Sequence, residues 1–157
     1  FKVGISTVRY FERSAKDVVI RELLPTPWTG DEFPGYDNIR LSCYQLESIF
    51  RLQKQDWLTA LGNQKAVYLI TDTSNGKCYV GSAYGEKMLL NRWQNYVTSK
   101  DGGNAQLQGL SKEHIQNNFR YSILDIFKAS TNDNVIIARE SWWKETLMTR
   151  KFGYNSN

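Results

Sequence analysis

The sequence has few of the residues on which disulfide-stabilised and zinc-binding folds depend. Its 157 residues include two cysteines, Cys43 and Cys78, and a single histidine, His114. The cysteines are far apart and show no CxxC spacing, so they give no basis for a disulfide framework or a zinc cluster. His114 lies in a polar segment without an evident partner, and we predict that it is a surface residue. Two reduced thiols are typical of a cytoplasmic protein, which is the location we expect.

Long apolar runs are also absent. None approaches the roughly 20 residues of a membrane-spanning helix, and no basic and apolar leader opens the chain, so we expect no membrane partner. Neither sign of charge dominates, because 20 basic and 16 acidic residues leave a net charge of +4. The pI near 9.0 tolerates a polyanionic partner without requiring one. Five Trp, nine Tyr and seven Phe are compatible with core packing, protein contacts or base stacking.

The chain is long enough for one core with a smaller unit appended at one end. Residues 1–64 are interpreted as an N-terminal extension that is irregular or mixed up to about residue 40, turn-rich at 26–35, and then helical. Ser42 and Gln45 have the spacing of a helix capping box. The extension is expected to bind DNA, to contact a second subunit in a homodimer, or to brace the rest of the chain. Residues 65–157 then form the main domain.

The sequence of the main domain predicts an α+β fold with a small, mostly antiparallel three-stranded sheet flanked by helices. Asn75-Gly76 marks the tip of a hairpin between two apolar stretches. The third strand alternates, with Tyr121, Ile123 and Asp125 expected on one side. The expected strands are 66–71, 77–83 and 119–127, and the expected helices are 86–97, 105–117 and a last helix from a cap at 130–133 to about 148.

The last helix places a carboxylate where an apolar residue is expected. Its apolar stripe consists of Ile136, Trp143 and Leu147. Glu140 occupies the matching position between them. Burying a carboxylate without a partner costs several kcal/mol of free energy, so this position implies a partner. The helix alone leaves that partner open between a metal ion and a base such as Arg139 or Lys144, and a position at the rim of the core is a further alternative.

The order of residues around the hairpin favours the metal ion. In chain order the pattern reads Ala66-Val67-Tyr68, Tyr79-Val80-Gly81, Arg92 and Tyr96 on one helix face, Glu140, and Asn155 in Gly153-Tyr154-Asn155. This succession resembles the GIY-YIG nuclease family over about residues 65–157, with Ala66-Val67 in place of Gly-Ile. The resemblance implies a catalytic domain that hydrolyses phosphodiester bonds in DNA.

The resemblance also implies roles for the two tyrosines. Tyr68 matches the proposed general base that takes a proton from the attacking water, and Tyr79 matches a residue that helps orient it. A free phenol titrates near pH 10, so the base needs a nearby cation, such as the metal ion or Lys77, to favour the phenolate. Lys77 lies two residues before Tyr79 and is expected on the same face of its strand. A solvated hairpin lysine is an equal alternative.

The other matching residues are expected to contact the phosphate. Arg92 would donate to the scissile phosphate, because a guanidinium matches phosphate geometry and keeps its charge. Tyr96 stands where many family members carry histidine and would hydrogen-bond a phosphate or the water. Asn155 would contact phosphate or fix the loop after the last helix, with a plain helix C-cap as the alternative. Lys112 and Lys144 are further candidates for contacts with the DNA backbone.

Glu140 is implied as the one direct protein ligand of the metal. Mg²⁺ is expected, with Mn²⁺ as a substitute, because an oxygen ligand completed by waters and phosphate oxygens suits a hard cation. We expect Glu140 to share one pocket with Tyr68, Tyr79 and Arg92. The predicted function is a metal-dependent DNA endonuclease in restriction, phage defence or repair. A non-catalytic DNA-binding module is the alternative, motivated by the altered first motif and Tyr96, and a protein-interaction domain is a third.

Overall fold

The structure is a computed structural model that describes residues 30–156. The sequence predictions for residues 1–29 lie outside this part. None of the described helices is long and apolar enough to cross a membrane. The elements in chain order are the 3-10 helix η1 (Tyr36–Asn38), β1 (Arg40–Ser42), α2 (Cys43–Arg51), α3 (Gln55–Gly62), β2 (Gln64–Asp72), β3 (Cys78–Ala83), α4 (Met88–Ser99), α5 (Ala105–Gln108), α6 (Lys112–Asn118), β4 (Phe119–Lys128), α7 (Asp133–Thr146) and α8 (Thr149–Phe152).

Four described strands form one antiparallel sheet in the order β1-β4-β2-β3. The predicted α+β fold is confirmed, but the predicted number of three strands is wrong. The additional strand is β1, which pairs with β4 and places Leu41 opposite Tyr121. β1 has three residues, of which only Leu41 is buried. Such a short strand shows no alternating pattern that could be read from the sequence.

The predicted hairpin is formed by β2 and β3. Its register places Tyr68 opposite Gly81 and Ile70 opposite Tyr79. Because side chains alternate along a strand, Tyr68 and Tyr79 point to the same face of the sheet and Val80 points to the other. The register therefore brings the two motif tyrosines together.

A β-bulge changes the pairing between β2 and β4. The register shifts between Val67 and Tyr68, so that Tyr68 lies opposite Ile123 and Val67 lies opposite Asp125. A bulge moves the residues beyond it to the other face. The prediction that Asp125 shares a side with Ile123 is therefore wrong, and Asp125 faces α7.

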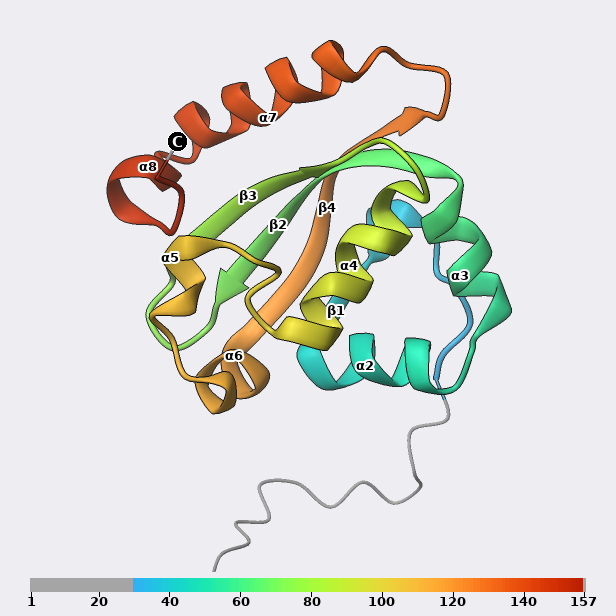
Figure 1. The fold of residues 1–157 in the computed structure, drawn as a ribbon, viewed down its shortest axis with the longest axis horizontal. Helices are drawn as coiled ribbons and strands as arrows, with labels where there is room; N and C mark the ends of the chain where they lie inside the picture. The colour runs from blue at the N-terminus through green and yellow to red at the C-terminus, as the bar shows by residue number, and fades with distance from the viewer. Residues whose placement is uncertain (1–29, 157) are drawn as a thin grey trace, which may run out of the picture.

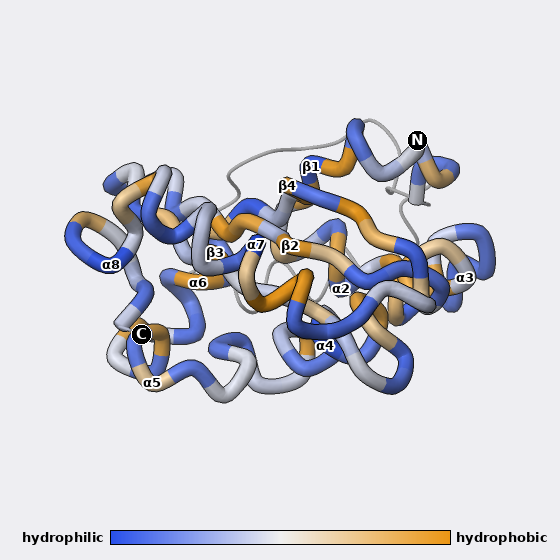
Figure 2. The backbone as a smooth tube through the Cα atoms, turned by 90° about the horizontal axis from the view of Figure 1, so that it is seen from above, coloured by the Kyte–Doolittle hydropathy of each residue, from blue (hydrophilic) through white to orange (hydrophobic). Residues whose placement is uncertain are grey.

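Helices cover both faces of the sheet (Figure 1). The larger core lies between the sheet and α2, α3 and α4, and includes Tyr68, Trp93 and Tyr121. The smaller cluster contains Val67, Val80 and Ile136 and lies under α7. Hydrophobic stretches of the central strands run through the middle of the molecule, and many outer turns are hydrophilic (Figure 2). Of the apolar stripe predicted for α7, Leu147 is exposed because the helix ends before it.

The helices that precede the hairpin belong to the larger core. α2 begins with the predicted capping box, in which the Ser42 hydroxyl accepts from the Gln45 amide and the Gln45 side chain accepts from the Ser42 amide. Leu46 is completely buried, and Trp57 is nearly so. The Trp57 indole N–H also donates to the carbonyl of Asp31 at 2.8 Å. These contacts support a bracing role for this region, and the DNA-binding and dimer roles stay predictions.

The bracing contacts predict a large stability effect at Leu46. Leu46→Ala is expected to lower the free energy of unfolding by about 2–5 kcal/mol, because it leaves a cavity in a position with no solvent exposure. Leu52→Ala is the control, because Leu52 is 41% exposed at the end of the same helix, and its effect should stay within about 0.5 kcal/mol. Urea unfolding followed by tryptophan fluorescence measures both. A small effect at Leu46 would show that α2 is not part of the cooperative core.

Candidate active site

Arg92 on α4 joins two phenols into one hydrogen-bonded cluster. Its Nε donates to the Tyr68 hydroxyl at 2.9 Å, and its Nη2 donates to the Tyr96 hydroxyl at 3.4 Å. The two hydroxyls are 3.1 Å apart and share a hydrogen bond. Both tyrosines are fully buried, whereas Arg92 is half-buried. Arg92 and Tyr96 thus share a helix face, as the sequence predicted.

The loop after α4 completes the surroundings of Arg92. Its Nη1 donates to the carbonyl of Gly102 at 3.2 Å. Gly102 has a φ of +61°, and a Cβ at this position would lie 2.4 Å from the ring of Tyr96. Glycine is therefore required both by the backbone and by the space available. The guanidinium has further N–H groups that no described residue engages, and these can donate to an anion.

Burial controls the protonation of this cluster. It raises the pKa of Tyr68 well above its ordinary value, although Arg92 opposes the shift. It also raises the pKa of Tyr96. For Arg92, burial lowers the pKa, but the neighbouring phenols more than offset this and the net shift is upward. Arg92 is therefore cationic and both phenols are neutral at ordinary pH, so the phenolate expected at Tyr68 is not favoured by the residues that surround it.

Tyr79 is the phenol of the site with access to solvent. It interacts electrostatically with Tyr68, Tyr96 and Arg92, so its hydroxyl lies near theirs. Tyr79 is 9% exposed, whereas Tyr68 and Tyr96 have no exposure. Its hydroxyl makes no hydrogen bond within residues 30–156. Tyr79 is thus placed to interact with water or with a substrate.

Gly81 provides the space that the Tyr68 side chain occupies. A Cβ at position 81 would lie 2.3 Å from the Tyr68 hydroxyl oxygen and 2.4 Å from its Cζ. Real non-bonded atoms do not approach so closely, and the phenol is held in place by Arg92. The glycine of the second motif is therefore a packing requirement of the tyrosine in the first.

Glu140 lies on the other face of the sheet. Its Oε2 accepts a hydrogen bond from the Ser82 hydroxyl, and its Oε1 lies 2.8 Å from Nζ of Lys144. Ser82 is adjacent to Gly81 in β3, so its side chain points away from Tyr68. The ion pair with Lys144, one of the alternatives considered for this helix, is therefore present.

The structure thus does not show the single pocket expected for the four motif residues. Tyr68, Tyr79 and Arg92 lie together on the α4 face, and Glu140 lies on the α7 face. What separates them is β3, which is an edge strand of the sheet. Side chains alternate along β3, and this alternation, which the order of the motifs along the chain does not reveal, divides the two sets. The candidate active-site residues therefore lie on both sides of β3, whose outer edge pairs with no further described strand.

Asn155 closes part of this open edge. Its Oδ1 accepts from the Val80 amide at 2.9 Å, and its Nδ2 donates to the Val80 carbonyl at 2.8 Å. The neighbouring Tyr154 amide donates to the Cys78 carbonyl at 2.9 Å. These bonds satisfy backbone groups of an edge strand as a further strand would. They support the predicted role of Asn155 in fixing the loop after the last helices, and its contact with phosphate stays a prediction.

The predicted lysines lie apart from the phenol cluster. Lys77 precedes β3, and its ammonium lies 5.6 Å from the ring centroid of Tyr154. Within the described residues, the cation that contacts Tyr68 is Arg92, so Lys77 does not supply the charge expected there. Lys112 is exposed in the first turn of α6. Catalysis by Lys77 and DNA contacts by Lys112 and Lys144 stay predictions.

His114 is not the unpartnered surface residue that the sequence suggested. Its Nε2 lies 2.7 Å from Oδ2 of Asp72, a carboxylate with no solvent exposure. Asp72 accepts further hydrogen bonds from the Ser74 amide and hydroxyl, the Asn75 side chain and the Tyr154 hydroxyl. Asp72 therefore ties the hairpin turn to α6 and to the C-terminal segment that carries Asn155. This network was not predicted from the sequence.

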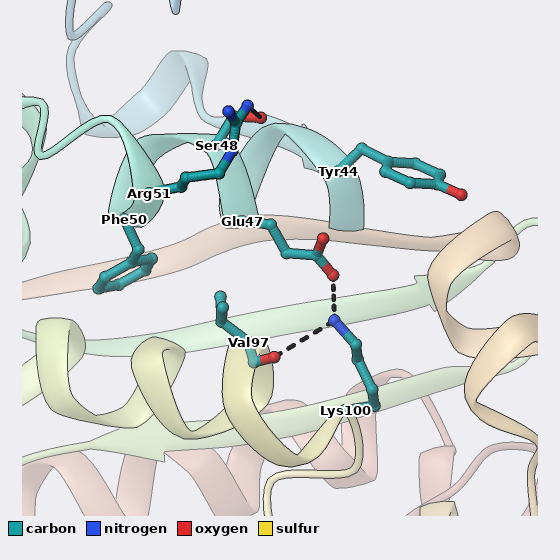
Figure 3. Close-up of a pocket in the computed structure, with 7 residues that line it drawn as sticks. All are labelled: Tyr44, Glu47, Ser48, Phe50, Arg51, Val97 and Lys100. Carbon is teal, nitrogen blue, oxygen red and sulfur yellow. Dashed lines mark hydrogen bonds and ion pairs between the residues drawn. The ribbon is translucent and has the colours of Figure 1, made fainter. Parts of the chain in front are cut away.

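A pocket elsewhere in the structure contains none of the motif residues. It lies between α2 and α4 and has a volume of about 540 Å³. Its lining residues are Tyr44, Glu47, Ser48, Phe50, Arg51, Val97 and Lys100. Lys100 forms an ion pair with Glu47 and donates to the Val97 carbonyl at 3.2 Å (Figure 3). Glu47 and Lys100 therefore compensate each other, and Arg51 adds one positive charge to the lining.

Comparison with known proteins identifies the family of the chain. The family model described as the GIY-YIG catalytic domain matches residues 64–155, which is more than half of the chain. The chain therefore belongs to the GIY-YIG nuclease family, and the predicted family is confirmed.

Two solved structures are similar, and both are of an endonuclease domain. One is a mutant of the catalytic domain of the intron endonuclease I-TevI, with 30% identity and a TM-score of 0.49 over 60% of this chain and 94% of that chain. The other is the catalytic domain of the homing endonuclease I-TevI, with 30% identity and a TM-score of 0.48 over 58% of this chain and 96% of that chain. A search of curated proteins found no match.

The packing of Gly81 predicts the effect of a single added methyl group. Gly81→Ala is expected to lower the free energy of unfolding by about 1–3 kcal/mol and to displace Tyr68 from Arg92, because the new Cβ overlaps the phenol. Gly109→Ala is the matched control, since its φ is −73° and a Cβ there meets nothing within 4 Å. Urea unfolding and the near-ultraviolet circular dichroism of the aromatic side chains measure the effects. Equal results for the two variants would contradict the proposed packing.

The Asp72 network predicts an acid-sensitive stability. Burial raises the pKa of Asp72, but the hydrogen bonds from Ser74, Tyr154 and His114 outweigh it and lower the pKa to about 2. A carboxyl with a depressed folded-state pKa stabilises the fold above its unfolded-state value near 4, and this stabilisation is lost as the pH falls toward 2.

Between pH 5 and pH 2, the wild-type protein should therefore lose about 2 kcal/mol more stability than Asp72→Asn. Urea unfolding across this pH range measures the difference. Parallel pH profiles for the two proteins would show that Asp72 is not held ionised by its neighbours.

Proposed function

We propose that the domain is a magnesium-dependent DNA endonuclease that hydrolyses phosphodiester bonds at the open edge of β3. Membership of the GIY-YIG family supports nuclease chemistry. The observation that carries the proposal is the position of Arg92, whose guanidinium is fixed by Tyr68, Tyr96 and Gly102 and keeps N–H groups for an anion. A phosphate at this edge can be approached by Arg92 from one face and by Glu140 from the other.

The residues on the α7 face fit a hard divalent cation. The described residues contain no group of three or more His, Cys, Asp or Glu that could hold a metal ion. Mg²⁺ commonly binds through one or two carboxylates and completes its shell with water and phosphate oxygens. Glu140 supplies a carboxylate, and Ser82 supplies a neighbouring hydroxyl. When bound, such an ion would neutralise charge on the phosphate, and Mn²⁺ accepts the same oxygen donors.

The side chains on the α4 face have separate roles in the proposed hydrolysis. Arg92 donates to the scissile phosphate and stabilises the negative charge that develops there. Tyr79, which is more exposed than Tyr68 and Tyr96, orients the attacking water. Tyr68 and Tyr96 hold Arg92 in position. Because burial keeps Tyr68 neutral, a general-base role for this phenol requires a cation beyond Arg92.

A non-catalytic DNA-binding module is the second candidate function. Two observations favour it: Lys144 neutralises the carboxylate of Glu140, and the Tyr68 hydroxyl has no exposure to solvent. Such a module would bind DNA in a salt-dependent way without cutting it. A place in restriction, phage defence or repair, a cytoplasmic location and a homodimeric state stay predictions.

The decisive assay is incubation with plasmid, branched and single-stranded DNA, with and without Mg²⁺. Cleavage is expected only with the metal, and Glu140→Gln and Arg92→Ala should each lower its rate by at least roughly 10²-fold, as the loss of a group that stabilises transition-state charge does. Arg51→Ala is the control, because Arg51 is an exposed arginine of α2.

Two other outcomes would redirect the proposal. Full activity of Glu140→Gln would remove Glu140 from the metal site. Gel-shift binding by the wild-type protein without cleavage of any substrate would favour the binding module.

A further inference from the structure

Lys144 is a charged side chain whose burial requires explanation. It lies on α7 one turn after Glu140, and it is 5% exposed. Lysine is almost never buried to this extent unless it is paired. Its Nζ lies 2.8 Å from Oε1 of Glu140, and the exposed fractions of the two side chains are 6% and 15%. The pair is therefore held largely away from water, in contrast to an ordinary ion pair on a helix surface.

Both oxygens of the Glu140 carboxylate are occupied. Oε1 pairs with Lys144, and Oε2 accepts from the Ser82 hydroxyl. The hydroxyl is a neutral donor that can reorient and offer its own oxygen to a cation. The ammonium has no lone pair to offer, and its positive charge repels a second cation. Of the two neighbours, only Lys144 therefore opposes metal binding at Glu140.

We propose that Lys144 is the resident counterion of Glu140 and that it sets the affinity of the site for divalent metal by competing for the carboxylate. The inference rests on the proposed function, in which Glu140 is the metal ligand. A buried carboxylate without a cation is strongly disfavoured, so Lys144 stabilises the domain in the absence of metal. An ammonium on a flexible four-carbon stem can then be displaced when a divalent ion arrives. The ion pair thus stabilises the fold in the absence of metal and lowers the affinity of Glu140 for a metal ion.

The test measures metal binding directly, in the absence of DNA. Mn²⁺ binding is followed by electron paramagnetic resonance or calorimetry for the wild-type protein, Lys144→Met and Glu140→Gln. Lys144→Met removes the charge with little change in volume and is expected to lower the Kd for Mn²⁺ about tenfold or more, since a unit charge about 4 Å away is worth at least this much near a protein surface. Glu140→Gln should abolish binding at this site.

Lys65→Met is the matched control. Lys65 is also a largely buried lysine paired with a carboxylate of α7, because its Nζ lies 2.8 Å from Asp133 and its side chain is 12% exposed. It does not contact Glu140, so this variant should bind Mn²⁺ as the wild-type protein does. An equal gain in Lys65→Met and Lys144→Met would reduce the effect to net charge and overturn the proposal.

A measurement on the wild-type protein removes any dependence on the folding of the variants. With ¹⁵N-labelled lysine side chains, addition of Mg²⁺ is expected to shift the ammonium resonance of Lys144 while that of Lys65 stays in place. A Lys144 resonance that does not move as the site fills would overturn the proposal, as would an unchanged Kd in folded Lys144→Met.

If Glu140→Gln binds Mn²⁺ as tightly as the wild-type protein, Glu140 is not the ligand and the competition proposal fails. Mg²⁺-dependent cleavage by the wild-type protein would still leave the nuclease proposal standing.

Discussion

The pairing register of β2 and β3 is the constraint on which the candidate site depends. It sets Tyr68 opposite Gly81, and it turns Tyr79 to the same face. A slip of one residue would move every side chain of β3 to the other face, because the side-chain period of a strand is two. The glycine at position 81 favours this register, because a Cβ at this position would overlap the Tyr68 phenol.

The open side of β3 needs its own support, because an edge strand leaves backbone groups unpaired. The C-terminal segment supplies this support through Tyr154 and Asn155, which bond to the backbone of Cys78 and Val80. That segment is anchored in turn by the bond between the Tyr154 hydroxyl and Asp72. Tyr154 and Asn155 therefore hold in place the strand that carries Tyr79 and lies between the two groups of site residues.

Much of the fold could be predicted because its signals are local. The hairpin follows from Asn75-Gly76 between two apolar runs, and the start of α2 follows from Ser42 and Gln45, three residues apart. The hydrogen bond that Asp72 accepts from the Ser74 amide is also local, although it was not predicted. The hydrogen bonds between Asp72 and the side chains of His114 and Tyr154 span 42 and 82 residues, so no local sequence pattern predicts them.

The site was predicted less completely than the fold for a related reason. The motif residues were identified from their order along the chain, but their order does not say which face of a sheet each side chain reaches. The alternation at Gly81 and Ser82 and the packing of α7 against the Ser82 face decide this, and the packing depends on the folded structure. Burial likewise decides that Tyr68 is a neutral phenol, and burial depends on how α4 packs against the sheet.

Among the described carboxylates that form ion pairs, Asp72 and Glu140 have the least exposed side chains, and they are stabilised in different ways. This difference is the reason for proposing a metal ion at Glu140 and not at Asp72. Asp72 is surrounded by donors that belong to its own turn and to the C-terminal segment, so they cannot leave without disrupting the hairpin. Glu140 is stabilised by one hydroxyl and one ammonium on a flexible stem. A carboxylate whose hydrogen-bond donors are fixed stabilises the fold. A carboxylate whose counterion can be exchanged is available to bind a metal ion.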